Sequence, residues 1–195
     1  MPAELDTIAF DSVAALRTWL DEHHESSPGI WVKMAKKGTG IATITWDELV
    51  DEGLCFGWID SQRNPLDDTY FVQRFTPRSK RSKWSKINTE RVARLTKAKR
   101  MRPAGLREVK AAKADGRWDA AYVGSKVAEV PDDLQAALDA SPAATEAFAG
   151  LDRTNRYAIL YRIGAVKKPE TRARKIAEFV AMLERGETVH PRSRK

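Results

Sequence analysis

The sequence of 195 residues contains little cysteine and little histidine. Its single cysteine, Cys55, excludes an intramolecular disulfide. Of the three histidines, His23 and His24 are neighbours on a predicted helix and point in different directions, and His190 lies far along the chain. Because a metal site needs several ligands at suitable spacing, we predict no metal.

Nucleotide-binding loops are also missing. Gly38-Thr39-Gly40 has neither the third glycine nor the following helix of a dinucleotide loop, and the chain contains no P-loop. We therefore predict no cofactor. Cys55 stands between Leu54 and Phe56, where a small buried hydrophobe is the usual role, so it is a weak candidate nucleophile and no catalytic residue is predicted.

Long apolar runs are absent as well. The run from Tyr157 to Val166 is interrupted and too short to cross a bilayer, which needs about 20 apolar residues. No membrane insertion is expected. The N-terminal MPAELDTIAFDS lacks the charged and then apolar pattern of a secretory signal peptide, and a cytoplasmic location is therefore expected.

Acidic residues are nearly absent from the stretch Arg74 to Arg102, which we call the basic segment. It carries twelve cations against one anion, a net charge of +11, whereas residues 1–73 carry −8 and residues 103–195 carry +4. Because an anionic partner responds to the local potential, we predict an anionic small molecule or an acidic protein surface as partner. Nucleic acid is an alternative, since clustered cations displace counterions from phosphates.

The basic segment also has a structural explanation, which we favour over nucleic acid because most charge runs are merely solvated. Its cations can form a solvated helix face. They can also be neutralised within the fold by four acids of the preceding predicted helix, Asp47, Glu48, Asp51 and Glu52.

The hydrophobic pattern predicts an α+β fold with a small antiparallel β-sheet of three strands and flanking helices, followed by a helical C-terminal module. A helix is expected from Val13, and Thr45-Trp46-Asp47-Glu48 is a capping box that begins a second. The strands are expected at 30–35, 58–63 and 69–76, the last two joined as a hairpin.

The second half reads as helices. The first begins at Ser85 or Asn88, and others open at Pro103, Pro131, Pro142 and Pro169, because proline suits a helix's first turn. We predict an α+β module over residues 1–123, a helical bundle over 124–186 and a flexible basic tail over 187–195. The connector Tyr122 to Glu129 is the expected boundary, although it can equally be a surface loop.

Several short blocks in a fixed order carry a family resemblance: Leu54 to Asp60, Gln73 to Arg78, Trp84 to Asn88, Gly116 to Asp119, and Glu170 to Arg172. Together they resemble the YdeI/OmpD-associated family of bacterial proteins over almost the whole chain. The resemblance implies bacteriocin protection and association with an outer-membrane porin. A protein-interaction module in a bacterial envelope-stress response is a further alternative. It implies no catalytic residues.

The predicted hairpin gathers polar and aromatic side chains. Strand alternation favours a cleft lined by Trp58, Asp60, Gln62 and Arg74, in which Arg74 binds a carboxylate or phosphate and Asp60 holds it in place. Such a cleft would suit a small-molecule enzyme. The competing interpretation is a structural Asp60–Arg74 pair across the two strands.

The predicted ligand-binding set also includes Arg78, Trp84, Lys86 and Asn88 of the basic segment. Trp84 stands among cations and would stack on an exposed base if nucleic acid binds. A secondary anion site is predicted at the start of the last helix, where the helix dipole disfavours cations; its residues are Arg172, Arg174 and Lys175.

Overall fold

The computed structural model describes residues 5–124 and 128–191. The chain divides into two compact units, with the boundary between Ala121 and Tyr122. Of the expected connector, residues 125–127 lie outside the described residues. The first unit combines a sheet with helices and the second is helical, so the predicted α+β class is confirmed.

The first unit contains four strands and four helices: β1 (Thr7–Ala9), α1 (Val13–His23), β2 (Ile30–Ala35), α2 (Trp46–Phe56), β3 (Trp58–Pro65), β4 (Tyr70–Pro77), α3 (Lys86–Lys97) and α4 (Pro103–Ala114). The strand order in the sheet is β1-β2-β4-β3. Strand β1 pairs in parallel with β2, and the other neighbours pair antiparallel. The prediction of three antiparallel strands was therefore wrong by one strand, because the three residues of β1 are too few to show a periodicity.

Helix α2 lies at the centre of this unit and is delimited as the sequence predicts. The Thr45 hydroxyl accepts the backbone N–H of Glu48, whose carboxylate accepts the backbone N–H of Thr45. Gly57 ends the helix with φ 77°, in the left-handed region that favours glycine. The chain therefore turns directly from α2 into β3.

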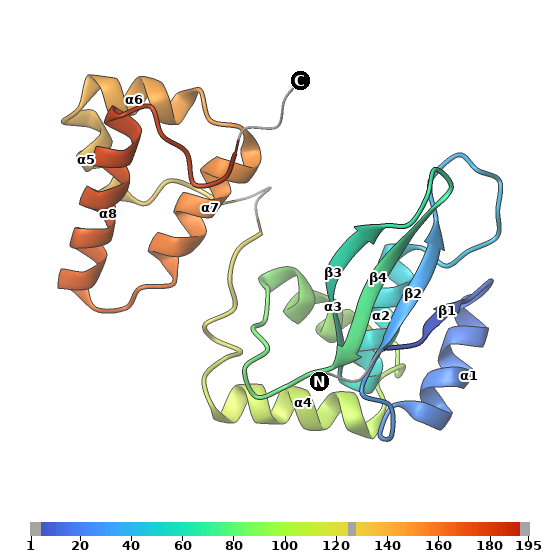
Figure 1. Cartoon of the computed structure of the whole chain (residues 1–195). Coiled ribbons are helices and arrows are strands. Elements are labelled where there is room, and N and C mark those ends of the chain that lie inside the picture. The colour runs from blue at the N-terminus through green and yellow to red at the C-terminus, as the bar shows by residue number, and fades with distance from the viewer. Residues whose placement is uncertain (1–4, 125–127, 192–195) are drawn as a thin grey trace. The chain divides into compact units, whose positions relative to one another are not determined.

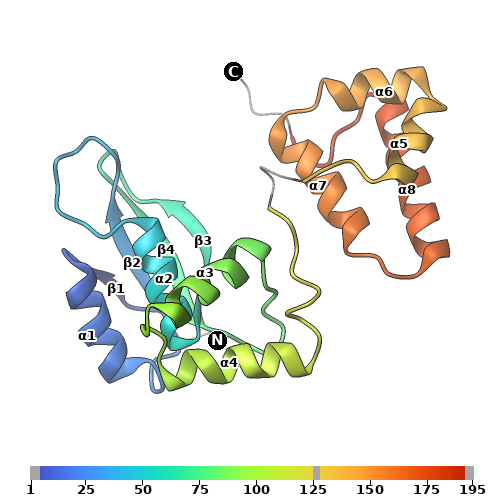
Figure 2. The ribbon, with the colours of Figure 1, turned by 180° about the vertical axis from the view of Figure 1, so that it is seen from behind.

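The two faces of the sheet differ. Along β2 and β4 every second side chain is buried, as the two-residue period of a strand requires; the buried ones are Ile30, Val32, Met34, Phe71, Gln73 and Phe75. The apolar ones share a core with α1 and α2, which lie before the sheet in Figure 2, and the Gln73 amide donates to the carbonyls of Ser61 and Gln62 on β3. On the opposite face, seen in Figure 1, no helix of this unit lies over the strands.

Helices α3 and α4 follow the hairpin. Ser85 caps α3 by accepting the N–H of Asn88. Helix α4 crosses the end of α2 so closely that a Cβ on Gly105 would lie 2.3 Å from the carbonyl oxygen of Cys55. Glycine at this position lets the two backbones meet.

The second unit contains α5 (Asp132–Asp139), α6 (Pro142–Ala149), α7 (Arg153–Gly164) and α8 (Pro169–Glu184). Its core includes Leu134, Phe148, Ile159 and Phe179. The tail predicted at 187–195 contacts the second unit where the structure describes it. Val189 packs on this core, and the N–H of His190 donates to the side-chain oxygen of the buried Asn155. Residues 192–195 lie outside the described residues. Among the described helices, none has the length and apolarity to cross a bilayer.

Candidate binding surface

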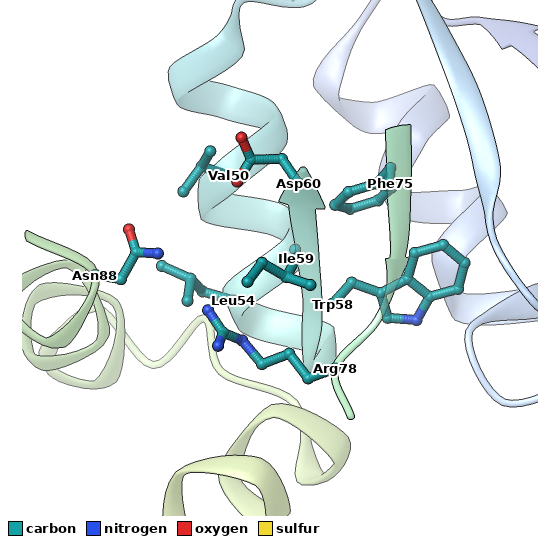
Figure 3. A pocket seen from close by; sticks show the side chains of 9 residues that line it. Val50, Leu54, Trp58, Ile59, Asp60, Phe75, Arg78 and Asn88 are labelled. Carbon is teal, nitrogen blue, oxygen red and sulfur yellow. The ribbon is translucent and has the colours of Figure 1, made fainter. Parts of the chain in front are cut away.

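Four of the predicted ligand residues lie close together on the helix side of the sheet. Trp58, Asp60, Arg78 and Asn88 line a hollow against α2, with Leu54 among the apolar side chains beside them (Figure 3). The hollow encloses about 160 Å³ between its lining atoms and leaves no room for a free water molecule. It is therefore a packed junction between helix and hairpin, and it does not provide a substrate cleft.

Trp58 is part of the core. Its side chain is 1% exposed and packs edge-on against Trp19, with ring centroids 5.7 Å apart. Its indole N–H donates to the carbonyl of His24 at 3.1 Å. The nearby Asp60 carboxylate accepts the indole N–H of Trp46 at 2.9 Å. Both side chains thus have structural partners.

Trp84 is buried rather than presented to a ligand. Its side chain is 1% exposed, and its ring centroid lies 3.8 Å from the Arg78 guanidinium carbon and 4.9 Å from the Trp118 ring. Arg78 also donates to the carbonyl of Lys83 at 3.3 Å. The prediction that Trp84 stacks on an exposed base was wrong, because Trp118 and Arg78 enclose its two sides.

Asp60 and Arg74 do not form a pair. Asp60 lies opposite Phe75 in the β3–β4 register, whereas Arg74 lies opposite Trp31 on β2. Directly paired residues share a face and Phe75 is buried, so Asp60 faces the helices and Arg74 faces away from them. The Asp60–Arg74 cleft and the cross-strand pair are both contradicted. Gln62 stands apart from both and donates to the side chain of Asn64.

Much of the basic segment is neutralised inside the fold. Arg91 contacts Asp47 and Asp51, Arg94 contacts Asp51 at 2.7 Å, and Arg100 contacts Glu52. Glu52 is fully buried and also binds Arg17 at 2.8 Å. The structural alternative for these three arginines is confirmed. Of the four acids considered, Glu48 instead closes the capping box with Thr45.

The ion pairs between α2 and α3 shift the pKa values of Asp51 and Arg91. Burial by itself raises the pKa of Asp51, but the hydrogen bonds and charges of Arg94 and Arg91 outweigh it, so the pKa lies below the ordinary aspartate value. Burial opposes the charge of Arg91, yet its bonds to Asp47 and Asp51 raise its pKa. Asp51 and Arg91 are therefore held ionised at neutral pH.

Other cations of the basic segment remain exposed. Within the described residues, five of them besides Arg74 make no ion pair with an acid: Lys80, Arg81, Lys86, Lys97 and Lys99. Lys86 is the first residue of α3, where the helix dipole disfavours a cation. These side chains are scattered over a loop and one helix surface.

The face of the sheet without a helix brings cations and aromatic rings together. We call it the open sheet face and define it by Trp31, Lys33, Tyr70, Val72, Arg74 and Thr76. Trp31 pairs with Arg74, and Lys33 pairs with Val72. The Lys33 ammonium lies 3.9 Å from the centroid of the Tyr70 ring. In the described part of the chain neither Lys33 nor Arg74 makes an ion pair.

Sequence reasoning identified Arg74 but missed Trp31 and Lys33. The signal was present, because in Ile30–Ala35 the apolar residues Ile30, Val32 and Met34 alternate with the other three. Alternation predicts one buried face and one outward face. What sequence alone lacked was the β2–β4 register that places Trp31 beside Arg74.

The secondary anion site is already occupied by acids of the chain. Arg172 binds Asp133 through two nitrogens, one at 2.9 Å, which raises its pKa, and it also donates to the carbonyl of Ile163. Lys175 binds Glu178 at 2.9 Å, and Arg174 lies 3.8 Å from it. These three cations therefore form intramolecular pairs.

A groove of about 580 Å³ lies between α5 and α8, beside Arg172. Alanines dominate its lining, including Ala137, Ala173 and Ala177, with Ile176 below them. The cation at the rim of this groove is Arg172, which is paired with Asp133. The groove is therefore not an anion site.

The candidate nucleophile is inert. Cys55 is fully buried, and burial, together with the nearby charge of Glu52, raises its pKa to about 11. A thiol with such a pKa is protonated at neutral pH and is a poor nucleophile. Among the described residues there is also no group of three or more histidine, cysteine, aspartate or glutamate side chains placed to hold a metal ion.

Comparison with known families divides the chain in two. Residues 8–108, just over half of it, match a domain of unknown function, DUF8412. Residues 127–186 match the family described as bacteriocin-protection, YdeI or OmpD-associated. Searches of curated proteins and of solved structures gave no match.

These matches narrow the resemblance seen in the sequence. Of its blocks, only Glu170 to Arg172 lies within 127–186, while Leu54 to Asp60, Gln73 to Arg78 and Trp84 to Asn88 fall within 8–108. The YdeI/OmpD-associated match is real but covers only part of the chain. The chain belongs to the DUF8412 family and carries a YdeI/OmpD-associated match in its second unit.

Proposed function

We propose that the first unit binds an anionic partner on the open sheet face. The observation that carries the proposal is the side-by-side position of Lys33 and Arg74 with Trp31 on a sheet face that no helix of this unit covers. The cations of α3 that pair with α2 are excluded from this role by their own acids.

The charge of the open sheet face supports this function. Lys33 lies two residues from Trp31 on β2, so the two side chains share a face at a spacing of about 7 Å. Arg74 lies directly across from Trp31 on β4. Among the described residues neither cation forms an ion pair, although the pKa of the exposed Asp67, which the backbone N–H of Tyr70 lowers most, is lowered further by the charge of Lys33. Neither therefore has to break an ion pair to bind an external anion.

The shape of the site favours an extended partner. The hollow on the helix side of the hairpin is filled by Trp58 and Leu54, whereas enzymes that bind small molecules usually enclose them in a concave pocket. A sheet face instead presents side chains in flat rows. A polyanion or an acidic surface can contact such rows at several points, and we favour this over catalysis.

Heparin, a sulfated polysaccharide, is a suitable general probe. Its affinity should be measured at several salt concentrations for the wild-type chain and for Lys33→Ala/Arg74→Ala. Lys97→Ala/Lys99→Ala is the matched control, since it removes the same charge from exposed positions at and beyond the end of α3.

We expect Lys33→Ala/Arg74→Ala to bind heparin at least tenfold more weakly than the wild-type chain. The slope of log affinity against log salt concentration should decrease in magnitude by about two, one for each lost cation contact. The Lys97/Lys99 control should change affinity less than threefold. Equal losses in the two variants, or no heparin binding at low salt, would overturn the proposed function.

The match of residues 127–186 suggests bacteriocin protection as the cellular setting. A bacterial strain lacking the gene should then be killed at lower bacteriocin concentration than its parent. Complementation with the wild-type gene should restore survival, and complementation with Lys33→Ala/Arg74→Ala should not. Unchanged killing in the deletion strain would remove this role while leaving the binding surface untouched.

A further inference from the structure

We infer that the anionic partner is a single-stranded nucleic acid, with one base stacked on Trp31. This inference rests on the proposed function and adds the chemical class of the ligand. It starts from the surroundings of the tryptophans, all six of which lie in the described part of the chain.

Five of the six indoles have a partner in the fold. Trp19 and Trp58 pack on each other, Trp84 packs on Trp118, and Trp46 donates to Asp60. Trp31 is different: across residues 5–124 and 128–191 its ring makes no aromatic or cation contact and its N–H makes no hydrogen bond.

The position of Trp31 adds to its availability. It sits on β2 between Thr7 of β1 and Arg74 of β4, in the interior of the sheet rather than at an edge. Its side chain is half-buried, and a strand lies on each side of it. A half-buried ring in this position loses little conformational freedom when a base stacks on it.

The neighbouring aromatic ring has a different role. The Lys33 ammonium lies over the face of Tyr70, a cation–π contact that holds the lysine within the open sheet face. Trp31 is thus left as the stacking ring, with Lys33 two residues along β2 and Arg74 across from it on β4 to contact phosphates.

Among anionic polymers, only single-stranded nucleic acid uses both features. Its bases expose flat π-faces that stack on aromatic side chains, and its phosphates follow at regular intervals. A duplex hides the base faces within its own stack. Sulfated polysaccharides and acidic protein surfaces supply anions but no bases, so they would use Lys33 and Arg74 alone.

The test compares three labelled ligands at one salt concentration: a 15-nucleotide oligothymidylate, the same length of duplex DNA, and heparin. Each is titrated with the wild-type chain, with Trp31→Leu and with Trp31→Phe. Leucine keeps an apolar side chain without a π-face, and phenylalanine keeps a smaller ring. Thermal unfolding of each variant serves as the folding control.

We expect the wild-type chain to bind the oligothymidylate more tightly than the duplex. Trp31→Leu should weaken oligothymidylate binding about tenfold, Trp31→Phe should retain most of it, and heparin binding should change less than twofold in both. Equal loss of heparin and oligothymidylate binding in Trp31→Leu, or no loss of either, would overturn the inference.

Ultraviolet cross-linking of the wild-type chain to the oligothymidylate gives an answer that needs no variant. The adduct is expected on the peptide that contains Trp31, and an adduct confined to α3 or to the loop at residues 79–85 would contradict the inference. If heparin binds through Lys33 and Arg74 while the oligothymidylate binds no better than duplex, the stacking inference fails and the proposed function stands. If neither ligand binds, both fail.

Discussion

The two faces of the sheet in the first unit use their cations in opposite ways. On the helix side, Arg91, Arg94 and Arg100 are bound to acids of α2, and Glu52 is fully buried among them. On the open side, Lys33 and Arg74 lie near Trp31 and form no ion pair in the described chain. The basic segment therefore contributes mainly ion pairs within the fold, and the candidate binding surface contains only two cations, Lys33 and Arg74.

The largest expected effect contrasts the tryptophans of the two faces. Trp84→Ala removes a ring enclosed by Arg78 and Trp118 and should lower the free energy of unfolding by about 4 kcal/mol. Trp31→Leu should lower it by no more than about 2 kcal/mol, because leucine keeps part of the apolar contact and Trp31 is less buried than Trp84. Urea unfolding measures both. Similar losses at the two positions would show that the faces do not differ in packing.

The next largest effect concerns the buried acid. Glu52→Ala leaves Arg17 and Arg100 without their shared carboxylate and should cost about 3 kcal/mol of unfolding free energy. Glu90→Ala, which removes an exposed acid from α3, is the control and should stay within about 0.5 kcal/mol. If Glu52→Ala lowered the unfolding free energy no more than Glu90→Ala does, the ion pairs of Glu52 would contribute nothing measurable to stability.

A smaller effect is expected in the pH dependence of stability. The pKa of Asp51 is lower in the fold than in the unfolded chain, so its ionised form stabilises the fold above the ordinary aspartate pKa. That stabilisation disappears as the pH falls through the lowered value.

Asp51→Asn should therefore be less stable than the wild-type chain at pH 7, by about 1 to 3 kcal/mol. The difference should be smaller at pH 2.5 than at pH 7, because the ionised form loses its advantage below the unfolded pKa. Urea unfolding at the two pH values measures it, with Asp119→Asn, an exposed aspartate beyond α4, as the control. A difference that is the same at both pH values would contradict the ionised Asp51 pair as its source.

The smallest effect on stability is expected on the open face. Arg74→Ala and Lys33→Ala should each change the unfolding free energy by no more than about 0.5 kcal/mol, since neither removes an ion pair in the described chain. Thermal unfolding checks this. A large loss in either variant would mean that the open face is structural as well.

The sequence anticipated features set by neighbouring residues. The Thr45–Glu48 capping box, the Ser85 cap and the prolines at 103, 142 and 169 are local signals, and each marks a helix start in the structure. Local hydrogen bonds and a fixed proline φ decide these positions almost independently of the rest of the chain.

Features set by distant residues were not predictable in the same way. A shift of register between Asp60 and Arg63 changes which residues of β3 and β4 face each other, and no sequence pattern marks it. Trp84 is buried by Trp118, which the chain brings back only after α3 and α4. The same dependence on register explains why Arg74 was identified without Trp31.

The central claim is that the binding surface lies on the open face of the sheet. Its most direct test is a nuclear magnetic resonance titration of the isotopically labelled chain with a heparin tetrasaccharide, following the backbone amides and the indole N–H groups. The account predicts that the largest shifts fall on Trp31, Lys33 and Arg74 and their strand neighbours. Shifts concentrated in α3 and in residues 79–85, with β2 and β4 unchanged, would contradict it.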